Sequence, residues 1–144
     1  MPAVPLGGTP REPPYIPPMR TLLTAFALLL AACSGEGPAP EVIHVDPSEA
    51  SALAQAGVTV LDVRTPQERA GGVIPGSVGA DWNGDFRAAI QQLDRDRPLV
   101  VTCESGRRST AALDVLAEEG FEDVAHLDGG MRAWRAAGLP TEAP

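Results

Sequence analysis

Residues 99–113 read Leu-Val-Val-Thr-Cys-Glu-Ser-Gly-Arg-Arg-Ser-Thr-Ala-Ala-Leu. The short run 99–102 is apolar and rich in β-branched residues, which is typical of a strand buried on both faces. Cys103 closes this run, a loop of small and charged residues follows, and a helical pattern resumes at once. The stretch therefore predicts a strand–loop–helix unit with a cysteine at the carboxyl end of the strand.

Strand-like and helix-like segments alternate along the chain from about residue 41. The expected strands are 42–45, 58–63, 98–103 and 124–127. The expected helices are 47–56, a short one after Thr65, one containing Phe86, Ile90 and Leu93 with Asn83 as its cap, 107–119, and 131–137. This alternation predicts an α/β fold with an open, mainly parallel sheet flanked by helices. Ligands of such sheets bind beyond the carboxyl ends of the strands, where Cys103 falls.

Two of these helices carry clear start signals. Asp46-Pro47-Ser48-Glu49 places a capping residue, a proline at the first helical position and a glutamate three residues after the cap. Thr65-Pro66-Gln67-Glu68 repeats the arrangement. Both sequences predict a capping box.

The loop around Cys103 has the composition of an anion site. Backbone N–H groups in such a turn face its concavity, and the helix that follows adds about half a positive charge. This setting lowers the pKa of a cysteine from ~8.5 to roughly 3.5–7.5, and Arg107 and Arg108 act in the same direction. We therefore expect a nucleophilic thiolate at residue 103 that is open to solvent and meets a small oxyanion.

Four segments together resemble the rhodanese (thiosulfate sulfurtransferase) homology domain over residues of about 41 to 138. They are Leu61–Glu68, Gly72–Ser77, Cys103–Ser109 and Gly129–Trp134. The resemblance implies a five-stranded parallel core and a catalytic Cys103 that carries sulfur as a persulfide. The family often has histidine where this chain has Val73, a difference that we interpret as structural.

The candidate substrate-binding residues are those of the loop: Glu104, Ser105, Gly106, Arg107, Arg108 and Ser109. The resemblance assigns the anion contact to Arg108, with Arg107 at the exposed rim. Ser105 and Gly106 permit the tight turn, and Ser109 is expected to bond into the loop as a helix-start hydroxyl. Glu104 is expected to point outward, because a carboxylate beside the thiol would raise the pKa of the thiol and repel an anionic donor.

Asp62 and Arg64 are expected to tie a strand to a loop, with Glu68 as a candidate partner of Arg64. His44 and His126 show no metal-ligand spacing with another histidine, cysteine or carboxylate, so neither a metal nor a cofactor is expected.

Trp82 and Trp134 are expected in the core, and the lesser alternative for Trp82 is a place at the mouth of a pocket.

Three functions are compatible with these residues. The first is a sulfurtransferase that moves a sulfane sulfur from a donor such as thiosulfate to cyanide or a thiol. The second is a phosphatase or arsenate reductase of related fold. Four residues separate Cys103 from Arg108, whereas those relatives enclose five in a wider cradle, which favours the first function. The third is a non-enzymatic persulfide carrier that delivers sulfur to a protein acceptor.

The N-terminal residues are typical of an export signal. Residues 1–32 hold a proline-rich extension and a short basic start at Met19-Arg20 with an apolar stretch after it, so Met19 is a candidate for the true start. Leu30-Ala31-Ala32-Cys33 resembles a bacterial lipobox, although a signal cut elsewhere is the alternative. Residues 33–40 would then form a lipidated tether, and 41–140 the domain. Ser34 after Cys33 favours the periplasmic face of the outer membrane.

The net charge and the number of cysteines are compatible with a lipid-anchored protein of the cell envelope. The formal net charge is −8, which argues against binding to nucleic acid or to anionic lipid through charge. The chain has two cysteines, and lipidation of Cys33 would leave Cys103 unpaired. We therefore expect membrane attachment through a lipid anchor alone.

Overall fold

The computed structural model describes residues 42–144 and contains one five-stranded sheet in the order β1-β5-β4-β2-β3. The strands are β1 (Ile43–Val45), β2 (Thr59–Asp62), β3 (Val78–Gly79), β4 (Leu99–Thr102) and β5 (Val124–Leu127). The helices are α2 (Pro47–Gln55), α3 (Pro66–Arg69), α4 (Phe86–Ile90), α5 (Arg107–Glu118) and α6 (Gly130–Ala136). All four strand pairings are parallel, which confirms the predicted fold class.

Helix starts follow the local sequence with one exception. Asp46 and Thr65 each form the predicted capping box, at the beginning of α2 and of α3. The prediction that Asn83 caps α4 is wrong, because Asp85 fills that position and its side chain accepts from the Ala88 amide at 3.1 Å. Asn83 lies two residues earlier, in a turn where its own amide donates to Asp81.

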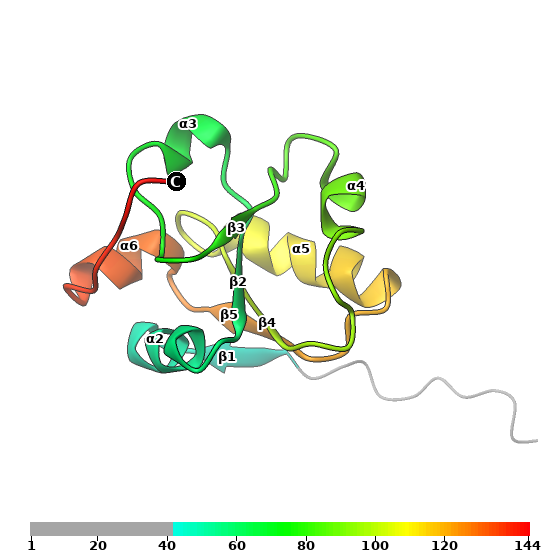
Figure 1. The fold of residues 1–144 in the computed structure, drawn as a ribbon, viewed down its shortest axis with the longest axis horizontal. Coiled ribbons are helices and arrows are strands. Elements are labelled where there is room, and N and C mark those ends of the chain that lie inside the picture. Colours follow the sequence, from blue (N-terminus) through cyan, green and yellow to red (C-terminus); the bar gives the residue numbers. More distant parts are fainter. Residues whose placement is uncertain (1–41) are drawn as a thin grey trace, which may run out of the picture. The chain divides into compact units, whose positions relative to one another are not determined.

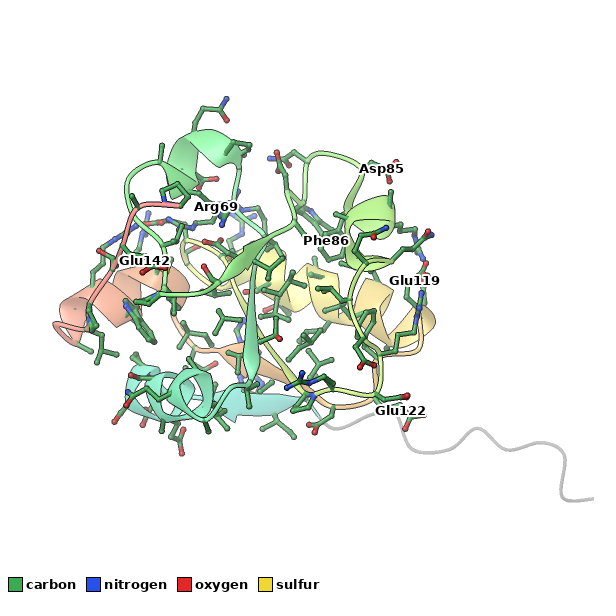
Figure 2. The ribbon with its side chains drawn as sticks, viewed as in Figure 1. Arg69, Asp85, Phe86, Glu119, Glu122 and Glu142 are labelled. Carbon is green, nitrogen blue, oxygen red and sulfur yellow. The ribbon has the colours of Figure 1, made fainter. Side chains whose placement is uncertain are left out.

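The sheet separates two apolar clusters, because successive side chains of a strand point to opposite faces. Leu99 and Val101 of β4 pack with Phe86 of α4 and Leu116 of α5. Val100, between them, joins the other cluster, which contains residues of α2 and α6. Figure 1 shows α2 and α6 on one side of the strands and α4 and α5 on the other. In Figure 2, Phe86 points inward from α4, whereas Asp85 lies at its outer end.

The edge of the sheet and the C-terminal segment show two features without a sequence signal. β3 has only two residues, and sequence analysis assigns no strand to this stretch. Val73 pairs with Glu142 in an isolated antiparallel bridge, and the Glu142 carboxylate accepts from the Gly76 amide at 2.8 Å. Figure 2 shows Glu142 on the C-terminal segment. The folded structure thus continues past the expected boundary at residue 140, and Val73 is buried in it.

The predictions for the signal peptide, for Met19 as the start, for lipidation of Cys33 and for the tether fall on residues 1–41, outside the described part of the chain. Between residues 42 and 144, no helix has the length and apolar character needed to cross a membrane.

Candidate active site

Cys103 follows the last residue of β4, and the turn after it leads directly into α5. Gly106 precedes the helix with φ of 98°, a left-handed conformation in which side chains are disfavoured. A Cβ at this position would have its nearest neighbour at 3.6 Å, so backbone conformation and not lack of space requires the glycine. The loop therefore forms the tight turn that Ser105 and Gly106 predict.

The loop directs hydrogen-bond donors at the sulfur of Cys103. The Gly106 amide donates to Sγ at 3.1 Å, and the Ser109 hydroxyl donates at 3.4 Å. Burial by itself raises the pKa of this thiol, but hydrogen bonds from the Ser109 side chain and from the amides of Ser109, Ser105 and Gly106 outweigh it. The net result is a Cys103 pKa below its usual value, which favours the thiolate.

The expectation that the thiol is open to solvent is wrong. Cys103 is 1% exposed, because its side chain packs into the α4–α5 cluster and the loop closes over the sulfur. A hollow of about 390 Å³ lies beside the loop and is lined by Trp82, Ser105, Arg107, Arg108 and Ala111. A ligand would approach the loop from this hollow. Trp82, which was expected in the core, is partly buried against it and also lines the hollow.

Arg108 reaches the site already paired with a carboxylate. Its Nη1 and Nη2 donate to the two oxygens of Glu68 at 2.7 and 2.6 Å. The hydrogen bond from Arg108 leads the effects that lower the Glu68 pKa to about 2. The Glu68 carboxylate therefore pairs with Arg108, while Arg64, its predicted partner, contacts Glu68 through the backbone carbonyl. Arg107, in contrast, is exposed at the rim as expected.

Arg64 and Asp62 form an ion pair whose two side chains are 0% exposed, with 2.7 Å between Nη2 and Oδ2. Arg64 also donates to the carbonyls of Gly72 at 2.9 Å and Glu68 at 3.3 Å. Removing one partner of such a pair leaves an uncompensated buried charge. These contacts join β2 to the segment around α3, so the expected structural role of the two residues is confirmed.

Glu104 is turned to α6 and not to the sulfur. Its Oε1 accepts from Arg135 Nη1 at 2.8 Å, and its Oε2 lies 3.5 Å from Arg64 Nη1. These two arginines hold the carboxylate in place. The concern that a negative side chain would face the thiol is removed by this pairing.

The start of α6 supports the loop from behind. The Met131 amide donates to the Cys103 carbonyl at 2.8 Å, and the Arg132 amide donates to the Glu104 carbonyl at 3.1 Å. A Cβ at Gly130 would lie 2.5 Å from the Cys103 carbonyl oxygen, closer than real contacts allow. The sequence signal for this role was the Gly129-Gly130 pair, which sequence analysis used only for the resemblance.

The structure brings together two histidines that sequence analysis left without partners. Parallel pairing of β1 and β5 sets His44 opposite His126, and Asp128 follows β5. Asp128 Oδ1 lies 2.6 Å from His44 Nδ1 and 3.3 Å from His126 Nδ1. The hydrogen bond from His44 is the main cause of a lowered Asp128 pKa. Sequence analysis finds no metal-ligand spacing for these residues, because proximity across two strands leaves no spacing signal.

The other predicted core aromatic is where it was expected. Trp134 is 2% exposed, in the cluster with α2, and its Nε1 donates to the Pro140 carbonyl at 2.9 Å. Ser109 is fully buried, and its hydroxyl oxygen also lies 3.1 Å from the Gly106 carbonyl oxygen as an alternative acceptor, so it bonds into the loop as predicted.

Comparisons with known proteins agree with this geometry. The family model of the rhodanese-like domain matches residues 46–137. Thiosulfate sulfurtransferase GlpE of Pseudomonas syringae pv. syringae (strain B728a) is 40% identical over 95 residues, which cover 66% of this chain and 89% of that protein.

Among solved structures, a rhodanese-related protein from Thermoplasma volcanium matches with a TM-score of 0.65 and 29% identity, covering 71% of this chain and 99% of that one. A Rhodopseudomonas palustris CGA009 protein described as a possible tyrosine phosphatase matches with a TM-score of 0.60 and 26% identity, covering 94% of this chain and 100% of that one. The chain belongs to the rhodanese-like domain family, and it is a sulfurtransferase.

Proposed function

We propose that the protein transfers a sulfane sulfur from thiosulfate, or a donor of that class, to cyanide or a thiol through a persulfide on Cys103. The Cys103 thiolate attacks the outer sulfur of thiosulfate, the sulfur–sulfur bond breaks, and sulfite leaves with the bonding electron pair. The acceptor then attacks the outer sulfur of the persulfide, and the Cys103 thiolate leaves. Covalent catalysis of this kind splits one transfer into two easier steps.

The observation that carries the proposal is the set of donors on the Cys103 sulfur, namely the Gly106 amide and the Ser109 hydroxyl. They favour the thiolate before attack and can stabilise it again when it leaves the persulfide. In enzymes that bind a developing anion, one such donor is worth about 3 kcal/mol. No external base is needed to generate the nucleophile.

Donor binding is assigned to the hollow beside the loop. Arg107 and Arg108 both line it, but Arg108 is bound to Glu68 while Arg107 is exposed. We therefore assign the first contact with the anionic donor to Arg107, and to Arg108 the positioning of the loop against Glu68. The net charge of −8 repels a doubly negative donor such as thiosulfate. The positive charge of Arg107 offsets this repulsion at the hollow.

Steady-state kinetics with thiosulfate and cyanide test the proposal. Two half-reactions through one enzyme intermediate predict parallel double-reciprocal lines. Arg107→Ala should raise KM for thiosulfate and leave the cyanide half-reaction unchanged, with exposed Arg97→Ala as the matched control. Intersecting lines, or no turnover with thiosulfate, would refute the proposal.

A phosphatase activity is the second candidate, and the Rhodopseudomonas palustris neighbour is the observation that favours it. The loop encloses four residues between Cys103 and Arg108, a narrow cradle for a phosphate group. Hydrolysis of p-nitrophenyl phosphate that depends on Cys103 would support this candidate. A persulfide carrier would instead form the persulfide with thiosulfate and release it only to a protein acceptor.

We also propose that the mature chain is attached to the cell envelope by lipid on Cys33, with the domain on the periplasmic face of the outer membrane. Support comes from Leu30-Ala31-Ala32-Cys33 at the end of the apolar stretch and from Ser34 after it. Mass spectrometry of the membrane fraction should find a lipidated N-terminal Cys33, and Cys33→Ser should abolish the modification. A soluble mature chain with unmodified Cys33 would contradict it.

A further inference from the structure

Three donor atoms that the proposed reaction does not use converge beside the cysteine loop. They are Nδ1 of His44, Nδ1 of His126 and Oδ1 of Asp128, and one such atom from each residue lies within 4.8 Å of the other two. The strand pairing explains why they meet. His44 and His126 are register partners on neighbouring parallel strands, and Asp128 lies two residues after His126.

The contacts of His126 leave its other ring nitrogen to the cluster. Its Nε2 lies 3.2 Å from the Gly106 carbonyl oxygen and 3.0 Å from the Ser109 hydroxyl oxygen, and both oxygens can accept a hydrogen bond. In the tautomer with its hydrogen on Nε2, Nδ1 bears the lone pair, 3.3 Å from an oxygen of Asp128. That tautomer presents Nδ1 to a metal, whereas in the other one Nδ1 donates to Asp128.

The burial of His126 fixes its ring. The residue is 5% exposed and is surrounded by protein atoms. His44 and Asp128 have side chains 57% and 56% exposed, so both can rotate. The cluster thus combines one fixed ligand with two adjustable ones.

We propose that His44, His126 and Asp128 form a binding site for a divalent transition metal of the zinc class. Two imidazole nitrogens and one carboxylate suit zinc, cobalt, nickel or copper, whereas magnesium and calcium prefer oxygen ligands. Bonds of about 2.1 Å require donors roughly 3.4 Å apart in a tetrahedral site. Small rotations of His44 and Asp128 supply that spacing. The metal replaces the hydrogen that these two residues share and releases it as a proton, and water takes the fourth position.

The site is connected to the cysteine loop but contains none of its candidate substrate-binding residues. Nε2 of His126 lies 3.2 Å from the carbonyl oxygen of Gly106, the residue whose amide binds the Cys103 sulfur. Outer contacts of this kind orient a ligating histidine and fix which nitrogen is free for the metal. A bound cation therefore holds the ring that supports Gly106.

The test uses the full chain with Cys33→Ser and Cys103→Ser, because thiolates would otherwise compete for the metal. Calorimetric titration with zinc should show one site per chain, and cobalt should give the visible absorption of a tetrahedral complex. His44→Gln and Asp128→Asn should each weaken zinc binding by about tenfold or more. Asp114→Asn, which makes the same charge change at an exposed position of α5, should leave the affinity unchanged.

Both ligand variants alter exposed side chains, so each should keep the unfolding temperature of its parent in the absence of metal. Absence of zinc binding in the double-serine chain would overturn the proposal. Equal zinc affinity in the His44 and Asp128 variants would overturn it as well. Sulfur transfer by the wild-type chain is measured separately, so failure of the metal site leaves the proposed function standing.

Discussion

The turns after β4 and β5 both lead to a glycine with positive φ that begins a helix without a side-chain cap, Gly106 at 98° and Gly129 at 71°. After β4, the Gly106 amide binds a sulfur. After β5, the amide of Met131 binds the Cys103 carbonyl oxygen of the neighbouring turn. The free N–H groups at a helix start bind whatever acceptor is presented to them. One turn is therefore available for anion chemistry, and the other is a structural support for it.

The largest difference between the two turns should appear on removal of the sulfur. Cys103→Ser should reduce sulfur transfer to background, because a hydroxyl is a far weaker nucleophile at neutral pH and cannot form a persulfide. The thiosulfate:cyanide assay measures this loss, and circular dichroism should show an unchanged fold. Substantial remaining activity would place the reaction outside the β4–α5 turn.

Replacing Gly106 or Gly130 by alanine should lower the free energy of unfolding for different reasons, one for backbone conformation alone and the other also for a steric clash. At Gly106 only the left-handed conformation is penalised, at about 1–2 kcal/mol. Gly130→Ala meets a similar penalty at φ of 58° and also a Cβ 2.5 Å from the Cys103 carbonyl oxygen. Overpacking of that kind adds about 1–3 kcal/mol.

Urea unfolding should therefore find Gly130→Ala the less stable variant of the two. If Gly106→Ala proves costlier, the supporting role of the second turn is wrong.

The donors of the first turn can be tested through the reactivity of the thiol. The folded pKa of Cys103 is below its usual value, so the alkylation rate should fall only as pH drops through that lowered pKa. Ser109→Ala removes the largest hydrogen-bonding contribution and should move the midpoint to higher pH. Iodoacetamide kinetics as a function of pH measure both midpoints.

Thr110→Ala is the matched control, because the Thr110 hydroxyl donates to the Gly106 carbonyl and not to the sulfur. An equal shift in both variants would contradict a direct effect of Ser109. A slow absolute rate in every variant is expected, since the sulfur is almost fully buried.

The smallest effect is expected from the ion pair at the edge of the first turn. The pKa of Glu68 is lowered from 4.5 to about 2, so the stability that the pair contributes is present above pH 4.5 and is lost as pH falls through about 2. The pair is partly exposed, so its contribution is about 1 kcal/mol or less. Urea unfolding of the wild type and of Glu68→Gln should converge in this acid range. A constant difference between them down to pH 2 would contradict the assignment.

A structural feature could be predicted from the sequence when the residues that cause it lie close together along the chain. The β4 strand, the Cys103 loop and the capping boxes at Asp46 and Thr65 are set within a few residues, and all were predicted. The pairing of the Glu68 carboxylate with Arg108 spans forty positions, and the sequence favours the nearer Arg64 as its partner.

The contact of His44 with His126 and the approach of Gly130 to Cys103 depend on strand order and register. Neither can be derived from spacing along the chain. The burial of the Cys103 sulfur was missed for a related reason: it arises from packing against α4 and α5, which are separate elements of the chain.

Mass spectrometry of the intact protein after incubation with thiosulfate shows whether Cys103 carries a persulfide. We expect the chain to gain one sulfur atom, to lose it again on reduction with dithiothreitol, and to gain nothing when Cys103 is replaced by serine. An unchanged mass in the wild type, or an equal gain in Cys103→Ser, would contradict a persulfide at this residue.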